Sequence, residues 1–142
     1  LVEFHELPTD SPTSVAGIDL VAVPVDHVVP TYGYLIGEPG CTVAVVTDTR
    51  DTHLIWERAA ASDDLAGVLI ETSFPDSQAE LAHATGHLTP SEVVRQLAKI
   101  GRDVRAIAVH LKPSSRDKLV AEIAALESPV LEVGLPGTVY SF

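Results

Sequence analysis

The order of strand-like and helix-like segments constrains the fold of this chain most strongly. Apolar, β-branched stretches occupy roughly the first third, at residues 18–25, 32–36 and 42–47, with turn residues between them. After about residue 50 the pattern becomes an alternation of helix-like and strand-like segments. Strands that come first and then alternate with helices predict an α/β (α+β) fold, with a mixed sheet and helices on one face.

Several segments carry start and stop signals for secondary structure. Thr89-Pro90-Ser91-Glu92 combines a capping box with proline at the first helical position, which predicts a helix start, and Gly101 predicts the end of that helix. We also expect helices at about residues 52–62, within 73–86 and after 114, a turn at 8–14, and strands at 1–7, 67–70, 104–109, 130–133 and 138–142.

Length and charge limit the classes of function. The 142 residues fit a single domain, and the formal net charge of −11 argues against binding to an extended nucleic acid, which needs basic patches. No apolar run is long enough to cross a membrane. The single cysteine cannot form an internal disulfide, so nothing requires an oxidising compartment.

Four residues with side chains suited to metal chemistry follow predicted strands or precede a helix. His27, Asp48 and His110 each come at or just after a strand end, and His87 lies three positions before Pro90. Such residues converge at one edge of an open sheet, and nitrogen and carboxylate ligands gathered there predict a metal centre, most plausibly zinc. Each also has a simpler interpretation, because strand-end aspartates are often turn residues and strand-end histidines are often only half exposed.

Other candidates carry weaker signals. His83 and His87 have H-x-x-x-H spacing, but Ala84 stands where a zincin has glutamate, so we do not expect a zincin site. His5 and His53 are typical of surface histidines. Glu71, at a strand end, could orient a metal ligand, but we expect it to be solvated.

Five stretches, taken in order, resemble the C-terminal half of the metallo-β-lactamase fold, an αββα sandwich. They are VPVDHVVPTYGYLI, VAVVTDT, VLIETSFPD, GHLTP and AVHLKP, within residues 23–113. The most similar branches are class II cyclic-nucleotide phosphodiesterases and the tRNA 3′-processing endonuclease ribonuclease Z. The resemblance implies hydrolysis of a 3′,5′-cyclic nucleotide such as cAMP, or a similar small phosphodiester, by a hydroxide activated at two metal ions.

The resemblance also implies a role for each of the four residues. His27 would bind one metal ion, His110 the other, and Asp48 would bridge both, with Zn²⁺ expected and Mn²⁺ or Fe as alternatives. His87 would contact the scissile phosphate and assist the leaving group. Alternative functions are ribonuclease Z-like tRNA processing, hydrolysis of thioesters, lactones or sulfate esters on the same fold, and a non-catalytic α/β binding or scaffold module.

One departure from the family pattern is serious, because the H-x-H-x-D-H motif that supplies further ligands has no counterpart in this chain. We therefore expect residues 1–142 to form a single partial domain whose partner is the N-terminal half of the fold, with a homodimer as a further possibility. Two ligands per ion are too few for tight zinc binding, so we expect the chain alone to be inactive. The compartment stays open: the cytoplasm is the default, and the periplasm is an alternative because the true N-terminus could be missing.

Overall fold

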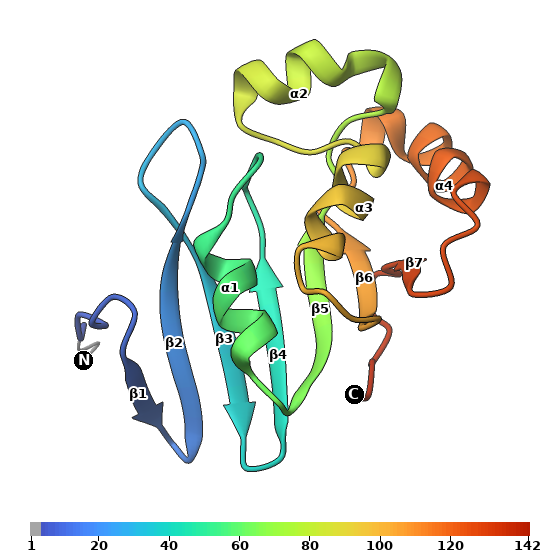
Figure 1. The fold of residues 1–142 in the computed structure, drawn as a ribbon. Helices are drawn as coiled ribbons and strands as arrows, with labels where there is room; N and C mark the ends of the chain where they lie inside the picture. Colours follow the sequence, from blue (N-terminus) through green and yellow to red (C-terminus); the bar gives the residue numbers. More distant parts are fainter. Residues whose placement is uncertain (1–3) are drawn as a thin grey trace.

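In the computed structural model, which describes residues 4–142, seven strands form one sheet in chain order (Figure 1). The strands are β1 (Pro12–Val15), β2 (Ile18–Val25), β3 (Thr31–Glu38), β4 (Cys41–Val46), β5 (Leu65–Glu71), β6 (Arg105–Val109) and β7 (Leu131–Val133). Neighbours from β1 to β4 pair antiparallel, and neighbours from β4 to β7 pair parallel. This mixed sheet confirms the predicted fold class.

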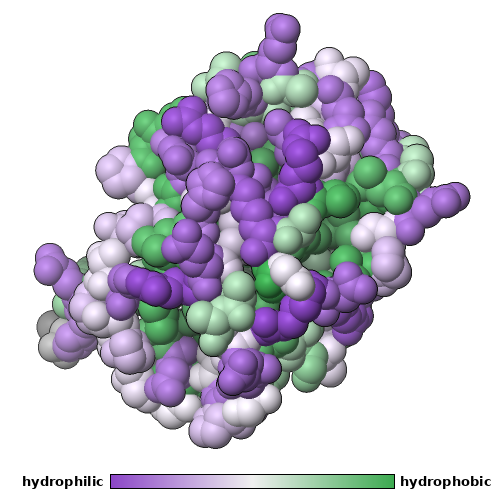
Figure 2. All heavy atoms as spheres, in the orientation of Figure 1, coloured by the Kyte–Doolittle hydropathy of each residue, from purple (hydrophilic) through white to green (hydrophobic). Residues whose placement is uncertain are grey.

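Three of the four α-helices in the described residues bury apolar residues against one face of the sheet. They are α1 (Leu54–Ala61), α2 (Ala79–Thr85), α3 (Pro90–Ala98) and α4 (Arg116–Ala125). Apolar side chains of α1, α3 and α4 join alternate strand residues in one buried cluster, which includes Ile55, Val93, Ile123, Val46 and Ile70. Figure 1 shows α1 and α3 in front of the sheet and α2 beyond the ends of the strands. Hydrophilic residues predominate on the helix-covered face, with apolar patches between them (Figure 2).

A buried polar contact joins α1 to α3 within this core. Trp56 is 1% exposed, and its indole N–H donates to Oε1 of Gln96 at 2.9 Å. Gln96 is itself 3% exposed and also accepts from the backbone N–H of Thr52 at 3.3 Å. The pair therefore satisfies the polar atoms that α1 and α3 bring into the core.

The predicted start of α3 is confirmed. The helix begins at Pro90, and the carboxylate of Glu92 accepts a hydrogen bond from the backbone N–H of Thr89 at 2.9 Å. This bond satisfies one of the N–H groups that a helix start leaves without a partner in the helix.

The predicted edge strand at residues 1–7 is wrong over residues 4–7, the part that the structure describes. Residues 1–3 lie outside the described part, and residues 4–8 form no strand. The edge strand is β1, which overlaps the segment predicted to be a turn, because β1 forms a hairpin with β2 across Ala16 and Gly17. Both turn residues have positive φ, at 53° and 86°, as a two-residue hairpin turn matching the twist of its strands requires.

The predicted strand at residues 138–142 is also wrong. This segment forms no strand, and the ring of Phe142 lies against Gly67, where a Cβ atom would come within 2.0 Å of it. The guanidinium of Arg105 lies 5.6 Å from the Phe142 ring centroid. Contacts with the sheet therefore hold the tail without strand pairing. Among the described residues, no helix is long and apolar enough to cross a bilayer.

Candidate metal centre

Sheet direction explains why the predicted site residues converge. β3 is antiparallel to both β2 and β4, and β4, β5 and β6 are parallel, so β2, β4, β5 and β6 all end at the same edge. This is the upper edge in Figure 1. His27, Asp48, Glu71 and His110 occupy or follow these four strand ends. His87, in the segment between α2 and α3, faces the same edge.

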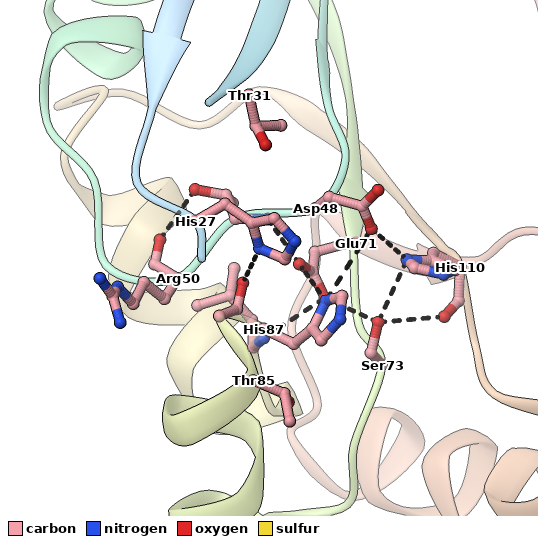
Figure 3. A network of polar contacts seen from close by, with 12 residues as sticks. His27, Thr31, Asp48, Arg50, Glu71, Ser73, Thr85, His87 and His110 are labelled. Carbon is pink, nitrogen blue, oxygen red and sulfur yellow. Dashed lines mark hydrogen bonds and ion pairs between the residues drawn. The ribbon is translucent and has the colours of Figure 1, made fainter. Parts of the chain in front are cut away.

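The four predicted side chains face one another across this edge (Figure 3). Oδ1 of Asp48 lies 3.0 Å from Nδ1 of His110 and 3.9 Å from Nδ1 of His87. The ring of His87 lies between two other imidazoles, with centroid distances of 5.1 Å to His27 and 5.5 Å to His110. The structure therefore brings all four together, as predicted.

Two of these residues have an unusual backbone. Asp48 and His110 adopt the left-handed conformation, with φ of 53° and 58°. Non-glycine residues rarely adopt it, although aspartate and histidine tolerate it better than most, and such strain clusters at functional sites. The conformation turns each side chain toward the other immediately after its strand ends.

His27 is oriented by a carbonyl group. Its Nδ1 lies 2.8 Å from the oxygen of Gly86, so Nδ1 carries the proton and Nε2 is free to bind a ligand. Gly86 caps α2 with φ of 80°, and a Cβ atom there would approach Nδ1 of His27 to 2.5 Å. Only glycine allows the helix end to lie this close to the ring.

Glu71 is not solvated, contrary to our expectation. Its side chain is 0% exposed, and Nδ1 of His87 lies 2.9 Å and 3.1 Å from its two carboxylate oxygens. The backbone N–H of Thr49, next to Asp48, donates to the same carboxylate at 2.6 Å. Burial of a carboxylate requires such donors, and here one of them is a site histidine.

Ser73 is a site residue that the sequence did not identify. Its hydroxyl lies 2.7 Å from Oε2 of Glu71 and 3.3 Å from Nδ1 of His110. The serine thus connects the buried carboxylate to the strand-end histidine. Its spacing of two residues from Glu71, just after a strand, was the available signal.

The histidines set aside in the sequence lie elsewhere. His83 is exposed on α2 and is not in the group of possible ligands, and the side chain of His53 is 73% exposed. His5 is exposed near the start of the described chain. The zincin interpretation therefore has no support.

A hydrogen-bonded aspartate holds the loop before α2 against α3. Asp76 accepts from the backbone N–H of Ser91 at 3.1 Å and from its hydroxyl at 2.7 Å. Burial alone would raise the pKa of Asp76, but the hydrogen bonds from the Ser91 and Thr89 side chains outweigh it, and the pKa is lowered from 3.8. The contact fixes both ends of the segment that carries His87.

Comparison with known protein families identifies the chain at this point. The family model described as a beta-lactamase superfamily domain matches residues 1–111. The chain belongs to this superfamily. No curated protein gives a significant sequence match to it.

Solved structures show the fold of this beta-lactamase superfamily domain. YhfI from Bacillus subtilis, a metallo-beta-lactamase fold protein, matches 94% of this chain and 54% of its own, with 18% identity and a TM-score of 0.76. Yeast PDE1 matches 91% and 47%, with 19% identity and a TM-score of 0.72. Human tRNase Z, short form, matches 91% and 45%, with 17% identity and a TM-score of 0.68. The chain therefore spans about half the length of each.

The candidate ligand atoms at this edge of the sheet are spaced as a zinc ion requires. Zinc bonds of about 2.0–2.1 Å at tetrahedral angles place neighbouring ligand atoms about 3.3 Å apart. The distance of 3.0 Å between Oδ1 of Asp48 and Nδ1 of His110 is close to this separation of ligand atoms. Among described residues, the group of possible ligands is Asp48, His87 and His110, with atoms within 4.8 Å of one another. By distance His87 joins this group and His27 does not, so the predicted division of roles between these two histidines stays a prediction.

Proposed function

We propose that this chain supplies half of the active site of a metal-dependent phosphodiester hydrolase, most specifically a 3′,5′-cyclic-nucleotide phosphodiesterase. The observation that carries the proposal is the convergence of Asp48, His87 and His110 at one edge of the sheet. The family match and the sequence resemblance of GHLTP and HLKP support the same class.

In this proposal the chain holds two divalent ions, with zinc expected. Asp48 would be a shared ligand of the two ions, His27 would hold one of them and His110 the other. When bound, the ions supply Lewis acidity that makes water a nucleophile at neutral pH and offsets phosphate charge. His87 hydrogen-bonds the scissile phosphate and donates a proton to the leaving oxygen.

We further propose that a second segment completes the site. The segment would carry H-x-H-x-D-H and cover the sheet face opposite the helices. Because strand residues alternate and Ala44 and Val46 lie in the helix-covered core, Val43 and Val45 point to that opposite face, where both are only half-buried. The coverage of only about half of the similar structures supports a segment of comparable size. We call the chain joined to this segment the assembled enzyme.

The test compares the chain alone with the assembled enzyme. We expect the assembled enzyme to bind two zinc ions and hydrolyse 3′,5′-cAMP, and the chain alone to do neither at a measurable rate. Turnover by the chain alone would refute the half-site. An assembled enzyme that hydrolyses a thioester or lactone but no phosphodiester would refute the phosphodiesterase class.

One further substrate and one variant separate the remaining functions. Cleavage of a tRNA precursor with a 3′ extension, in preference to cAMP, would replace the cyclic nucleotide by the ribonuclease Z-like alternative. Asp48→Ala tests the non-catalytic alternative: in the enzyme it abolishes metal binding and activity while the fold is kept. If the change alters neither property, the chain is a scaffold.

A further inference from the structure

A pocket of about 410 Å³ lies between α2, α3 and the loop that links β4 to α1. Its volume falls within the range of about 300–1,000 Å³ that is typical of small-molecule sites. Three cationic side chains line it, those of Arg50, Arg95 and Lys99. The whole chain has only nine lysines and arginines and a net charge of −11, so one pocket holds a third of its cationic side chains. Such a local excess of cations in an acidic protein indicates an anionic ligand.

Lys99 is already engaged by its neighbours. Its Nζ contacts a carboxylate oxygen of Asp51 and donates to the carbonyl of Thr52 at 2.6 Å. Nε2 of Gln96 donates to the same oxygen of Asp51 at 2.7 Å. These contacts join α3 to the loop before α1, so Lys99 and Gln96 fix two walls of the pocket to each other.

The two arginines keep most of their donors unused. Nη2 of Arg50 lies 3.5 Å from Asp26, and Nη2 of Arg95 lies 3.7 Å from Glu92. Both distances are longer than the about 2.7–2.9 Å of a good charge-assisted hydrogen bond. Glu92 is moreover engaged in the cap of α3, where it accepts from the backbone of Thr89. Because a guanidinium group carries several N–H donors in a planar fork, each arginine can still hold an anion.

The pocket adjoins the candidate metal centre but has donors of its own. His87 lines the pocket and also belongs to the group of possible metal ligands. The backbone N–H of Arg50 donates to the carbonyl of Asp26 at 2.8 Å, and its side chain points away from the three labelled histidines (Figure 3). Arg95 lies on α3 beside Gln96, which is 3% exposed and holds the helix in place. An anion bound by the two arginines is therefore distinct from one bound at the metal ions.

We propose that this pocket binds a phosphate group, separately from the metal ions, through the guanidinium groups of Arg50 and Arg95. The planar fork of N–H donors in arginine matches the oxygens of a phosphate, which a lysine ammonium cannot do. The phosphate has two possible sources: a terminal phosphate of a substrate whose diester lies at the metal centre, or a free phosphate ion. The first source rests on the proposed phosphodiester hydrolysis, whereas the binding itself does not.

The first experiment titrates inorganic phosphate into the 142-residue chain and follows the NMR signal of the indole N–H of Trp56. This single indole donates to Gln96, whose side chain lines the pocket, so a bound ion should shift its resonance. A chelator keeps the chain free of metal, and a pH of about 8 keeps phosphate a dianion. We expect saturable binding with a Kd of about 1 mM or lower, and no saturable shift with chloride at matched ionic strength.

Two variants remove one guanidinium group each, and a third is their matched control. Arg50→Gln and Arg95→Gln should each raise the Kd for phosphate by about 10–100-fold, the factor that a hydrogen bond to a charged group typically contributes. Lys118→Gln removes the same charge from α4, where the side chain is 53% exposed, and should change the Kd by less than about twofold because salt screens remote charges.

The outcome that overturns the proposal is equally specific. Absence of saturable phosphate binding would do so, as would equal Kd values in Arg95→Gln and Lys118→Gln. The side chain of Arg95 is 65% exposed on its helix, so this variant decides the matter even if Arg50→Gln fails to fold.

The assembled enzyme distinguishes the two sources of phosphate. Its substrates are two linear dinucleotides that differ only in a 5′-terminal phosphate. If that phosphate occupies the pocket, its presence should lower KM by at least about tenfold, and Arg95→Gln should abolish the difference. Equal KM values, together with saturable phosphate binding, assign the pocket to free phosphate. If the assembled enzyme hydrolyses no diester, the proposed function fails, while phosphate binding by the chain alone still stands.

Discussion

Replacing Gly86 by alanine should displace His27 and destabilise the chain more than an otherwise equivalent change. Gly86 has φ of 80°, and its new Cβ would lie 2.5 Å from Nδ1 of His27 and 3.1 Å from the backbone nitrogen of Val28. A left-handed alanine costs about 1–2 kcal/mol, of which the stiffer unfolded chain offsets about 0.4–1 kcal/mol. Losing the bond from His27 to the Gly86 carbonyl adds about 0.5–1.5 kcal/mol. We therefore expect a loss of about 2 kcal/mol in unfolding free energy.

Gly101→Ala is the matched control. Gly101 has nearly the same φ, 77°, and follows a helix, but a Cβ atom there would meet nothing within 4 Å. Gly101→Ala should therefore lower the unfolding free energy only by the cost of a left-handed alanine backbone, about 1 kcal/mol. Urea unfolding, followed by the fluorescence of the single tryptophan, Trp56, measures both losses.

The ring of His27 provides the second assay. Its nitrogen-15 shifts should change in Gly86→Ala, because Nδ1 loses its carbonyl partner, and should be unchanged in Gly101→Ala. The zinc affinity of the assembled enzyme should fall only in the first variant. Equal losses of stability together with an unchanged His27 spectrum would refute the close approach of the α2 end to this ring.

Three further predictions concern the site, the core and pH. Asp48→Asn should abolish zinc binding by the assembled enzyme but change unfolding free energy by less than about 0.5 kcal/mol, because asparagine also tolerates a left-handed backbone; unfolding by urea alongside zinc titration checks both. Gln96→Leu should cost about 1–3 kcal/mol in urea unfolding by leaving the indole N–H of Trp56 unpaired, and a loss below about 0.5 kcal/mol would contradict the buried contact. Because its lowered pKa favours the charged form in the folded state, Asp76 stabilises the fold above its ordinary pKa of 3.8, and this stabilisation is lost as pH falls through the lower folded value. Acid titration should therefore show a smaller loss of stability in Ser91→Ala than in the unchanged chain.

The sequence predicts much of the site because strand ends are local features. β-branched runs ending at His27, Asp48 and His110 indicate where each strand stops. Because these strands run in the same direction, their ends meet at one edge of the sheet. The helix start at Pro90 is equally local. These elements depend on their own residues, so a single sequence is sufficient to predict them.

The features that the sequence missed depend on contacts between distant segments. Burial of Glu71 requires donors from residues 22 positions earlier and 16 positions later, which no local pattern reveals. β1 is composed of turn-like residues and becomes a strand only by pairing with β2. The tail at residues 138–142 has strand-forming residues, but Phe142 lies on the sheet at Gly67 instead of pairing with it.

The row of seven strands in chain order has a consequence for unfolding. His27, Asp48 and His110 follow β2, β4 and β6, so an ion cluster held by all three would bridge five adjacent strands at one end. Separating any pair of strands within that span would then require an ion to be released. Metal binding should therefore oppose the separation of these strands. Backbone amides of β3 and β5, which supply no predicted ligand, should exchange hydrogen more slowly in the metal-bound protein than in the metal-free protein.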